Sequence, residues 1–122
     1  MRTHRDERRL FYGDIFDTPF GDINIVALAR HVPIAWHRHQ RQDDNLFLVS
    51  GRLRVQIIDD AGARVAWVLS SKNRGSLKIG RGSWHGYEAL TSNTIVLQFN
   101  APGKWDGSDE ERMSLNEMPW DK

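Results

Sequence analysis

Residues 34–51, IAWHRHQRQDDNLFLVSG, decide the fold predicted for this chain. The stretch holds two histidines, His37 and His39, followed by an apolar run at 46–49 and a Ser-Gly turn. Side chains two residues apart in an extended strand point to the same face of a sheet. The pattern therefore predicts a strand that projects two imidazoles together. They serve either as ligands for a metal or as an acid–base pair inside a pocket.

The composition predicts one domain spanning residues 1–122, with a charged arm at 1–10 and an acidic tail at 106–122. A net charge of +1 provides no field for binding nucleic acid or a membrane surface. Without cysteine, the chain can form neither a disulfide nor a thiolate metal site. The charged start and the short apolar runs predict neither a signal peptide nor a spanning segment, so a cytoplasmic protein is expected.

Short apolar or alternating segments separated by turn residues predict an all-β protein. The expected strands cover residues 11–16, 23–29, 31–39, 45–49, 52–58, 64–69, 76–79, 84–90 and 94–100. One short helix is predicted within 108–118, because Ser108 is a suitable N-cap and acidic residues follow it. Strands of this number and length favour a β-sandwich or a small barrel, and a jelly roll fits best because its interior can hold one ligand site.

Two segments resemble the sequence motifs of the cupins. His37-x-His39, followed by Asp44 and Gly51, is similar to the first cupin motif, with aspartate in place of the usual glutamate. The run from Gly75 through Gly80-Arg81-Gly82 to Ser83-Trp84-His85 is similar to the second, with glycine in place of the usual proline. The resemblance implies a jelly-roll β-barrel, also called a double-stranded β-helix.

Within the cupins, the segment 77–87, LKIGRGSWHGY, and the tail at 109–121 resemble dTDP-4-dehydrorhamnose 3,5-epimerases. The paired histidines look more like those of the dTDP-sugar 3,4-ketoisomerases. Both families are homodimers that act on 4-keto-6-deoxy sugar nucleotides without a metal. The resemblance therefore implies a homodimer, a sugar-nucleotide substrate and no cofactor.

The first functional hypothesis is an epimerase or isomerase that moves a proton beside a ketone. Histidine is the natural base near neutral pH, and a phenol can return the proton. The expected catalytic residues are His37, His39, His85 and Tyr87, with Tyr12 as the other available phenol. Arginines can hold a pyrophosphate and indole rings can stack on a sugar or base. The expected substrate-binding residues are Trp36, Arg38, Arg41, Lys78, Arg81, Trp84 and Gln98.

Two alternatives stay open from the sequence. His37, His39, Asp44 and His85 match the common cupin ligand set, which would hold one zinc, iron, manganese or nickel ion. Gln98 falls near the position of the epimerase tyrosine, and glutamine cannot replace a phenol as an acid. That substitution suggests a catalytically silent sugar-binding relative.

Overall fold

The computed structural model describes all 122 residues, and they form eleven β-strands and no helix. No helix is therefore available that could cross a lipid bilayer. The strands are β1 Arg2–Arg5, β2 Arg9–Gly13, β3 Asp22–Leu28, β4 Ile34–His39, β5 Asp43–Ser50, β6 Leu53–Ile58, β7 Arg64–Leu69, β8 Ser76–Ile79, β9 Trp84–Ala89, β10 Thr94–Ala101 and β11 Glu110–Arg112.

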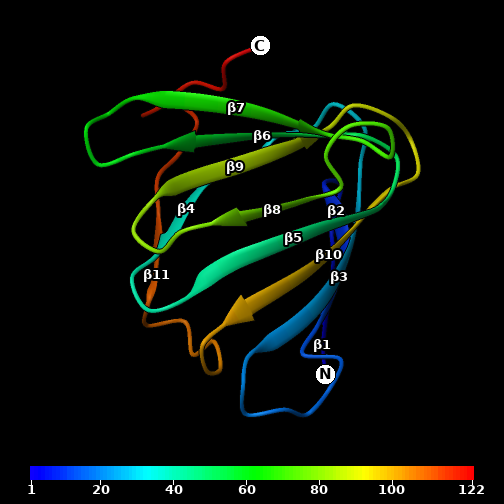
Figure 1. Cartoon of the computed structure of the whole chain (residues 1–122), viewed down its shortest axis with the longest axis vertical. Coiled ribbons are helices and arrows are strands. Elements are labelled where there is room, and N and C mark those ends of the chain that lie inside the picture. Colours follow the sequence, from blue (N-terminus) through cyan, green and yellow to red (C-terminus); the bar gives the residue numbers. More distant parts are fainter.

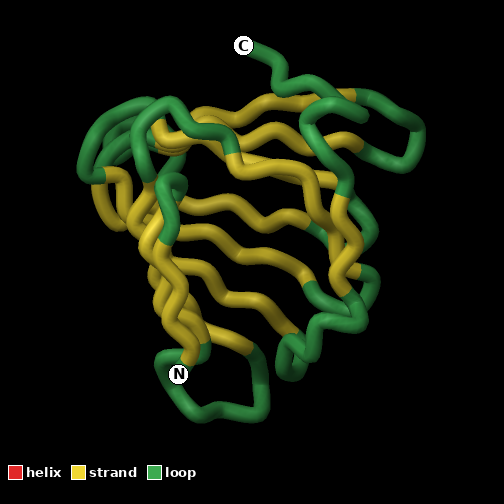
Figure 2. Tube along the Cα trace, turned by 180° about the vertical axis from the view of Figure 1, so that it is seen from behind, coloured by secondary structure: helices red, strands yellow, loops and turns green.

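Two antiparallel sheets form the molecule, and the predicted all-β single domain is confirmed. Sheet A has the order β1-β2-β3-β10-β5-β8, and sheet B has the order β11-β4-β9-β6-β7. Figure 1 shows the strands of both sheets crossing the molecule, and Figure 2 shows from behind how loops connect them at both ends. Alternate residues of β3 and β10, such as Val26 and Val96, are buried between the sheets with Leu53 and Val55 of β6.

Strand β4 carries the histidine pair and contains a β-bulge. Ala35 pairs with Gly86 of β9 and His37 pairs with His85, so Trp36 is an extra residue on β4. The bulge allows Ile34, a core residue, and His37 to share the inner face although they are an odd number of residues apart. Gly86 permits this close pairing, because a Cβ there would overlap the Ala35 methyl group.

The first residues are part of sheet A rather than the charged arm expected from the sequence. β1 and β2 form a hairpin in which His4 pairs with Phe11, and β2 pairs with β3 through Phe11 and Val26. A register partner lies on the same face of a sheet. Because Val26 is buried in the core, Phe11 and His4 lie on the inner face as well, where the half-exposed His4 lines the cavity described below.

The predicted helix within 108–118 is wrong, because the acidic segment pairs with the edge of sheet B instead. β11 is antiparallel to β4, and Arg112 pairs with His37. The Asp109 carboxylate accepts hydrogen bonds from the backbone N–H groups of Gln40 and Arg41, at 3.0 and 2.8 Å. These contacts with the β4–β5 turn replace the helical cap that the local sequence favours.

The remaining tail, residues 113–122, covers the outer face of sheet B. The Trp120 ring lies 5.3 Å from that of Trp36, and its indole N–H donates to Glu88. Trp36 donates its own indole N–H to the Met118 carbonyl. Gln56 donates to the Asp121 carbonyl and is fully buried beneath the tail.

Sheet A, in contrast, leaves an apolar surface uncovered. We define the outer apolar face as the outward side chains of three adjacent strands, namely Ile23, Ile25, Phe47, Val49, Ile95, Leu97 and Phe99. Phe47 is 51% exposed and Val49 is 54% exposed. None of these side chains is charged, so the face can pack against another apolar surface without burying a charge.

Candidate functional site

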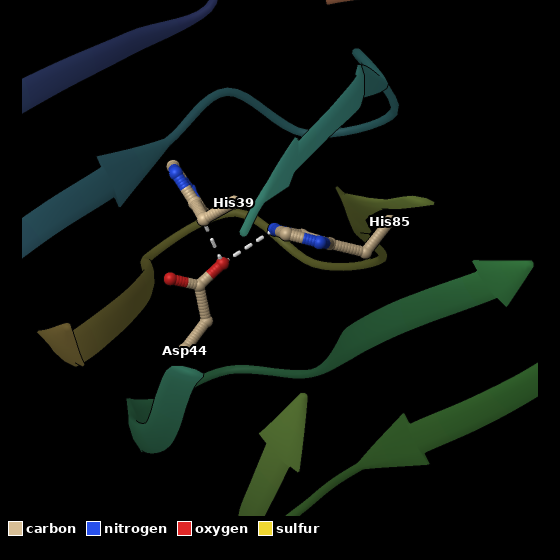
Figure 3. A group of neighbouring side chains, drawn as sticks. All are labelled: His39, Asp44 and His85. Carbon is tan, nitrogen blue, oxygen red and sulfur yellow. Dashed lines mark ion pairs between the residues drawn. The ribbon is translucent and has the colours of Figure 1, made fainter. Parts of the chain in front are cut away.

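Three side chains from different strands meet between the sheets. His39 ends β4, Asp44 lies at the start of β5, and His85 is on β9; their nearest ligand atoms all lie within 4.8 Å of one another. One Asp44 oxygen lies 2.5 Å from His85 Nε2 and 3.6 Å from His39 Nε2. Figure 3 shows this oxygen between the two imidazoles, while the second oxygen points away. All three residues are buried.

The hydrogen bond of His85 matches that of a metal-ligating histidine. His85 Nδ1 lies 3.1 Å from the Ser83 carbonyl, which can only accept, so Nδ1 carries a hydrogen. In the neutral imidazole, Nε2 then presents its lone pair to Asp44, as a ligating histidine held by a backbone carbonyl does. The buried atoms His39 Nδ1 and Asp44 Oδ1 have no hydrogen-bond partner. Two nitrogens and a carboxylate are donors that zinc, iron, manganese and nickel accept, so the residues fit a metal ion.

His37 adjoins this group without belonging to it. Its ring centroid lies 4.6 Å from that of His85 and 6.2 Å from that of Tyr87. Burial, as the main cause, together with the neighbouring imidazoles of His85 and His39, holds the pKa of His37 well below its ordinary value of 6.5. Burial raises the pKa of Tyr87 above 10. Both groups are therefore neutral at physiological pH, His37 as a potential proton acceptor and Tyr87 as a donor.

A cavity of about 520 Å³ opens beside these residues. His37, His39, Asp44, Tyr87 and Gln98 all line it. His85 does not line it but contacts Asp44, which does. Gln98 donates its amide N–H to the Tyr87 oxygen at 2.9 Å, which leaves the phenol hydrogen free to donate elsewhere. The volume falls in the range of small-molecule sites. The structure thus brings together all four predicted catalytic residues and Asp44.

The arginines predicted to hold a pyrophosphate lie elsewhere and have carboxylate partners. Arg38 is on the outer face of sheet B, where it pairs with Glu111 at 2.7 Å. Arg41 pairs with Asp106 at 3.2 Å. Arg81 pairs with Asp43 at 3.3 Å. None of the three arginines lines the cavity.

The other predicted substrate-binding residues divide between the cavity and the surface. Trp84 lies under Arg38, whose guanidinium is 4.4 Å from its ring centroid. Lys78 is exposed and lies 3.6 Å from Asp43. Trp36 reaches the cavity wall but is anchored to the tail. Tyr12 does not line the cavity either, which leaves Gln98 as the predicted substrate-binding residue held inside it by a hydrogen bond.

Sequence reasoning missed a set of cations on the cavity wall. The inner face of the β1–β2 hairpin presents Arg2 and Arg9, and β11 presents Arg112 beside His37. The alternation of Arg9 and Phe11 at 9–11 was the available signal, because it predicts that the two side chains share one face. The signal for β11 was absent, since its pairing depends on a contact with a distant strand.

Neither a protein-family model nor a curated protein sequence matches this chain. Solved structures do match it. The capsular polysaccharide assembling protein CapF from Staphylococcus aureus superposes with a TM-score of 0.81 and 15% identity, over 93% of this chain and 34% of CapF. Oxalate decarboxylase from Bacillus subtilis superposes with a TM-score of 0.79 and 14% identity, over 92% of this chain and 30% of that enzyme.

A formate complex of Lactobacillus farciminis oxalate decarboxylase matches at 14% identity with a TM-score of 0.77, over 92% of this chain and 33% of that protein. The chain therefore spans about a third of the length of the structures it resembles. At these identities the likeness establishes the fold, which is the cupin jelly roll predicted from the two motifs.

Proposed function

We propose that the protein is a metal-binding cupin in which His39, Asp44 and His85 hold one divalent transition-metal ion at the wall of a ligand cavity. The observation that carries the proposal is the meeting of three buried donors within 4.8 Å. A carboxylate oxygen 2.5 Å from an imidazole nitrogen whose hydrogen is on the other ring atom brings two lone pairs together, and a cation beside them that both atoms bind relieves this repulsion. A metal ion meets that need without protonating the histidine.

A bound divalent ion would supply a Lewis acid that polarises a ligand oxygen in the cavity. The surrounding residues orient the ligand and exchange protons with it. Neutral His37 accepts a proton, and the Tyr87 phenol, with its oxygen fixed by Gln98, donates one. The ring separation of 6.2 Å allows His37 and Tyr87 to contact one small ligand at the same time.

A second candidate is the metal-free proton transfer on a 4-keto sugar nucleotide that the sequence motifs favour. The specific observation in its favour is that His37 and Tyr87, a base and an acid, face the cavity together. The likeness to CapF, described as a capsular polysaccharide assembling protein, supports a sugar-derived substrate. In this function Asp44 would orient the histidines rather than bind a metal.

The deciding experiment measures the metal content of the untagged protein, purified without chelator, by inductively coupled plasma mass spectrometry. We expect close to one transition-metal ion per chain. The His39→Ala variant removes a donor and should lose the metal. The matched control is His31→Ala, because His31 is exposed and its only ion-pair partner is Glu88.

A parent protein that stays metal-free after incubation with zinc or manganese would overturn the metal proposal. Solvent deuterium exchange into a 4-keto sugar nucleotide then tests the second candidate. Exchange that is abolished in a His37→Ala variant would support proton transfer by this histidine. The absence of exchange in the parent protein would exclude it.

A further inference from the structure

Positively charged residues outnumber negatively charged ones in the cavity, and only some of them are in ion pairs. Six of them line it, namely Arg2, Arg8, Arg9, Asp44, Arg112 and Glu110. Asp44 belongs to the donor cluster, and Glu110 is paired with Arg112 at 2.7 Å. Arg8 is paired with Asp6 at 2.9 Å. Arg2 and Arg9 form no ion pair, so the cavity keeps two uncompensated positive charges.

Arg9 is the more deeply placed of these two cations. It pairs with Leu28 of β3, whose side chain is in the core, so Arg9 extends inward. Its Nε is buried and has no hydrogen-bond partner. The guanidinium carbon lies 5.2 Å from the Phe11 ring centroid, which supports one side of the planar group.

Arg9 lines the same cavity as two residues of the candidate site. His37 on β4 and Tyr87 on β9 border this cavity from sheet B, and Arg9 on β2 borders it from sheet A. A ligand in the cavity can therefore lie beside the Arg9 guanidinium and these two side chains.

A buried guanidinium N–H without a partner is costly, and the cost is removed when an oxyanion accepts from it. The planar fork of arginine matches carboxylate and phosphate oxygens, which accept two parallel hydrogen bonds. A neutral ligand would leave the positive charge uncompensated, and a cationic ligand would be repelled. The Arg9 guanidinium thus favours a ligand with a carboxylate or phosphate group.

We propose that Arg9 binds the carboxylate or phosphate group of the ligand that occupies this cavity, with Arg2 supplying a second unpaired positive charge from the same hairpin. Arg2 is held by stacking on Trp105, at 4.5 Å from the ring centroid. Only the reaction of the bound ligand at the metal rests on the proposed function. The anion subsite itself lies on the β1–β2 hairpin, includes none of the three metal donors and requires no metal.

Calorimetric titration tests the subsite with four probes, namely oxalate, malonate, inorganic pyrophosphate and the neutral oxamide. Each is titrated into chelator-treated and into zinc-loaded protein, for the parent and for Arg9→Gln, Arg9→Lys and Arg81→Gln. Arg81→Gln is the charge-matched control, since Arg81 is paired with Asp43 outside the cavity. Circular dichroism and thermal melting verify that each variant is folded, and Arg9→Lys keeps the charge if the glutamine variant does not fold.

We expect at least one anion to bind the parent and oxamide not to bind. Arg9→Gln should weaken the binding of that anion roughly 10- to 100-fold. Arg9→Lys should weaken it less, and Arg81→Gln should leave the affinity unchanged. Preference for oxalate or malonate identifies a carboxylate ligand, and preference for pyrophosphate identifies a phosphate ligand. Equal losses in Arg9→Gln and Arg81→Gln, or binding of none of the anions, would overturn the subsite. If the protein takes up no metal but still binds an anion through Arg9, the subsite is supported and only the metal proposal is refuted.

Discussion

Replacing Asp44 by asparagine should make the metal-free protein more stable while removing its response to metal. Asp44 is 6% exposed, and its Oδ1 has no hydrogen-bond partner. Burying such an oxygen costs about 1–3 kcal/mol, and more when it is charged. An asparagine amide can instead donate to His85 Nε2, whose lone pair faces it because Nδ1 donates to Ser83.

The expected magnitude follows from these terms. Asp44→Asn should raise the free energy of unfolding in chelator by about 1–2 kcal/mol, because a neutral amide is less costly to bury than a carboxylate. For a domain of this length the melting temperature rises by roughly 3–6 °C per kcal/mol. Zinc at a hundred times its Kd should stabilise the parent by about 2.7 kcal/mol and the variant hardly at all. The order of stability therefore inverts between the two conditions.

Urea unfolding followed by tryptophan fluorescence, in chelator and in excess zinc at equal ionic strength, measures both free energies. The matched control is Asp43→Asn, because Asp43 accepts a hydrogen bond from the Arg81 N–H at 2.9 Å outside the donor cluster. Its effect should be the same in both conditions. If Asp44→Asn instead destabilises the chelated protein by about 3–5 kcal/mol, Asp44 forms a structural ion pair with protonated histidine and the reasoning fails.

Three further predictions concern the rest of the molecule. The homodimer expected from the sequence should form through the outer apolar face, so Phe47→Glu should halve the mass measured by light scattering; an unchanged mass would exclude this face. Trp120→Ala should lower the free energy of unfolding by about 2–3 kcal/mol, because it removes the ring contact with Trp36 and the hydrogen bond to Glu88; a loss below about 0.5 kcal/mol would show that the tail is not docked. Burial alone would raise the pKa of Asp109, but its hydrogen bonds from Arg41 and Gln40 and the Arg41 charge lower it below 3.8. This contribution is present above pH 3.8 and is lost as the pH falls through the folded-state value, so hydrogen exchange should show β11 separating from β4 below pH 3.8 in the parent. The acid-dependent step should be smaller in Asp109→Asn, where the Arg38–Glu111 pair remains, and a step of equal size would exclude this role of Asp109.

Local patterns predicted several strands well, because apolar or alternating runs between turn residues are encoded in adjacent residues. The ranges 64–69 and 76–79 agree with β7 and β8, and the start of the strand at Trp84 also agrees. The meeting of His39, Asp44 and His85 could be expected from the two motifs once a jelly roll was assumed, whereas His37, the fourth predicted ligand, lies beside the group. Strand β11 could not be expected, because its acidic residues favour a helix start locally and only the edge of β4 makes them a strand.

The choice of substrate-binding residues depended on which face each side chain takes. Arg38 lies between two inward histidines, so strand alternation already places it outside. Arg81 and Arg41 are in turns, where no period assigns a face, and only the structure shows their carboxylate partners. Arg9 could have been placed inward by its spacing from Phe11, but no local signal shows that β2 pairs with β3.

Because β4 contains an extra residue, the face on which a side chain of this strand lies does not follow from counting residues along it. With the bulge, two consecutive side chains, Ala35 and Trp36, occupy the place opposite a single glycine of β9. A strand shortened by one residue here would regain simple alternation and still present Ile34 and His37 to the interior. It would lose the Trp36 indole, whose N–H donates a hydrogen bond to the Met118 carbonyl of the tail. Deletion of Trp36 thus keeps Ile34 and His37 on the inner face but removes the side chain that attaches the tail. A deletion variant can therefore separate the ligand site of this strand from its attachment of the tail.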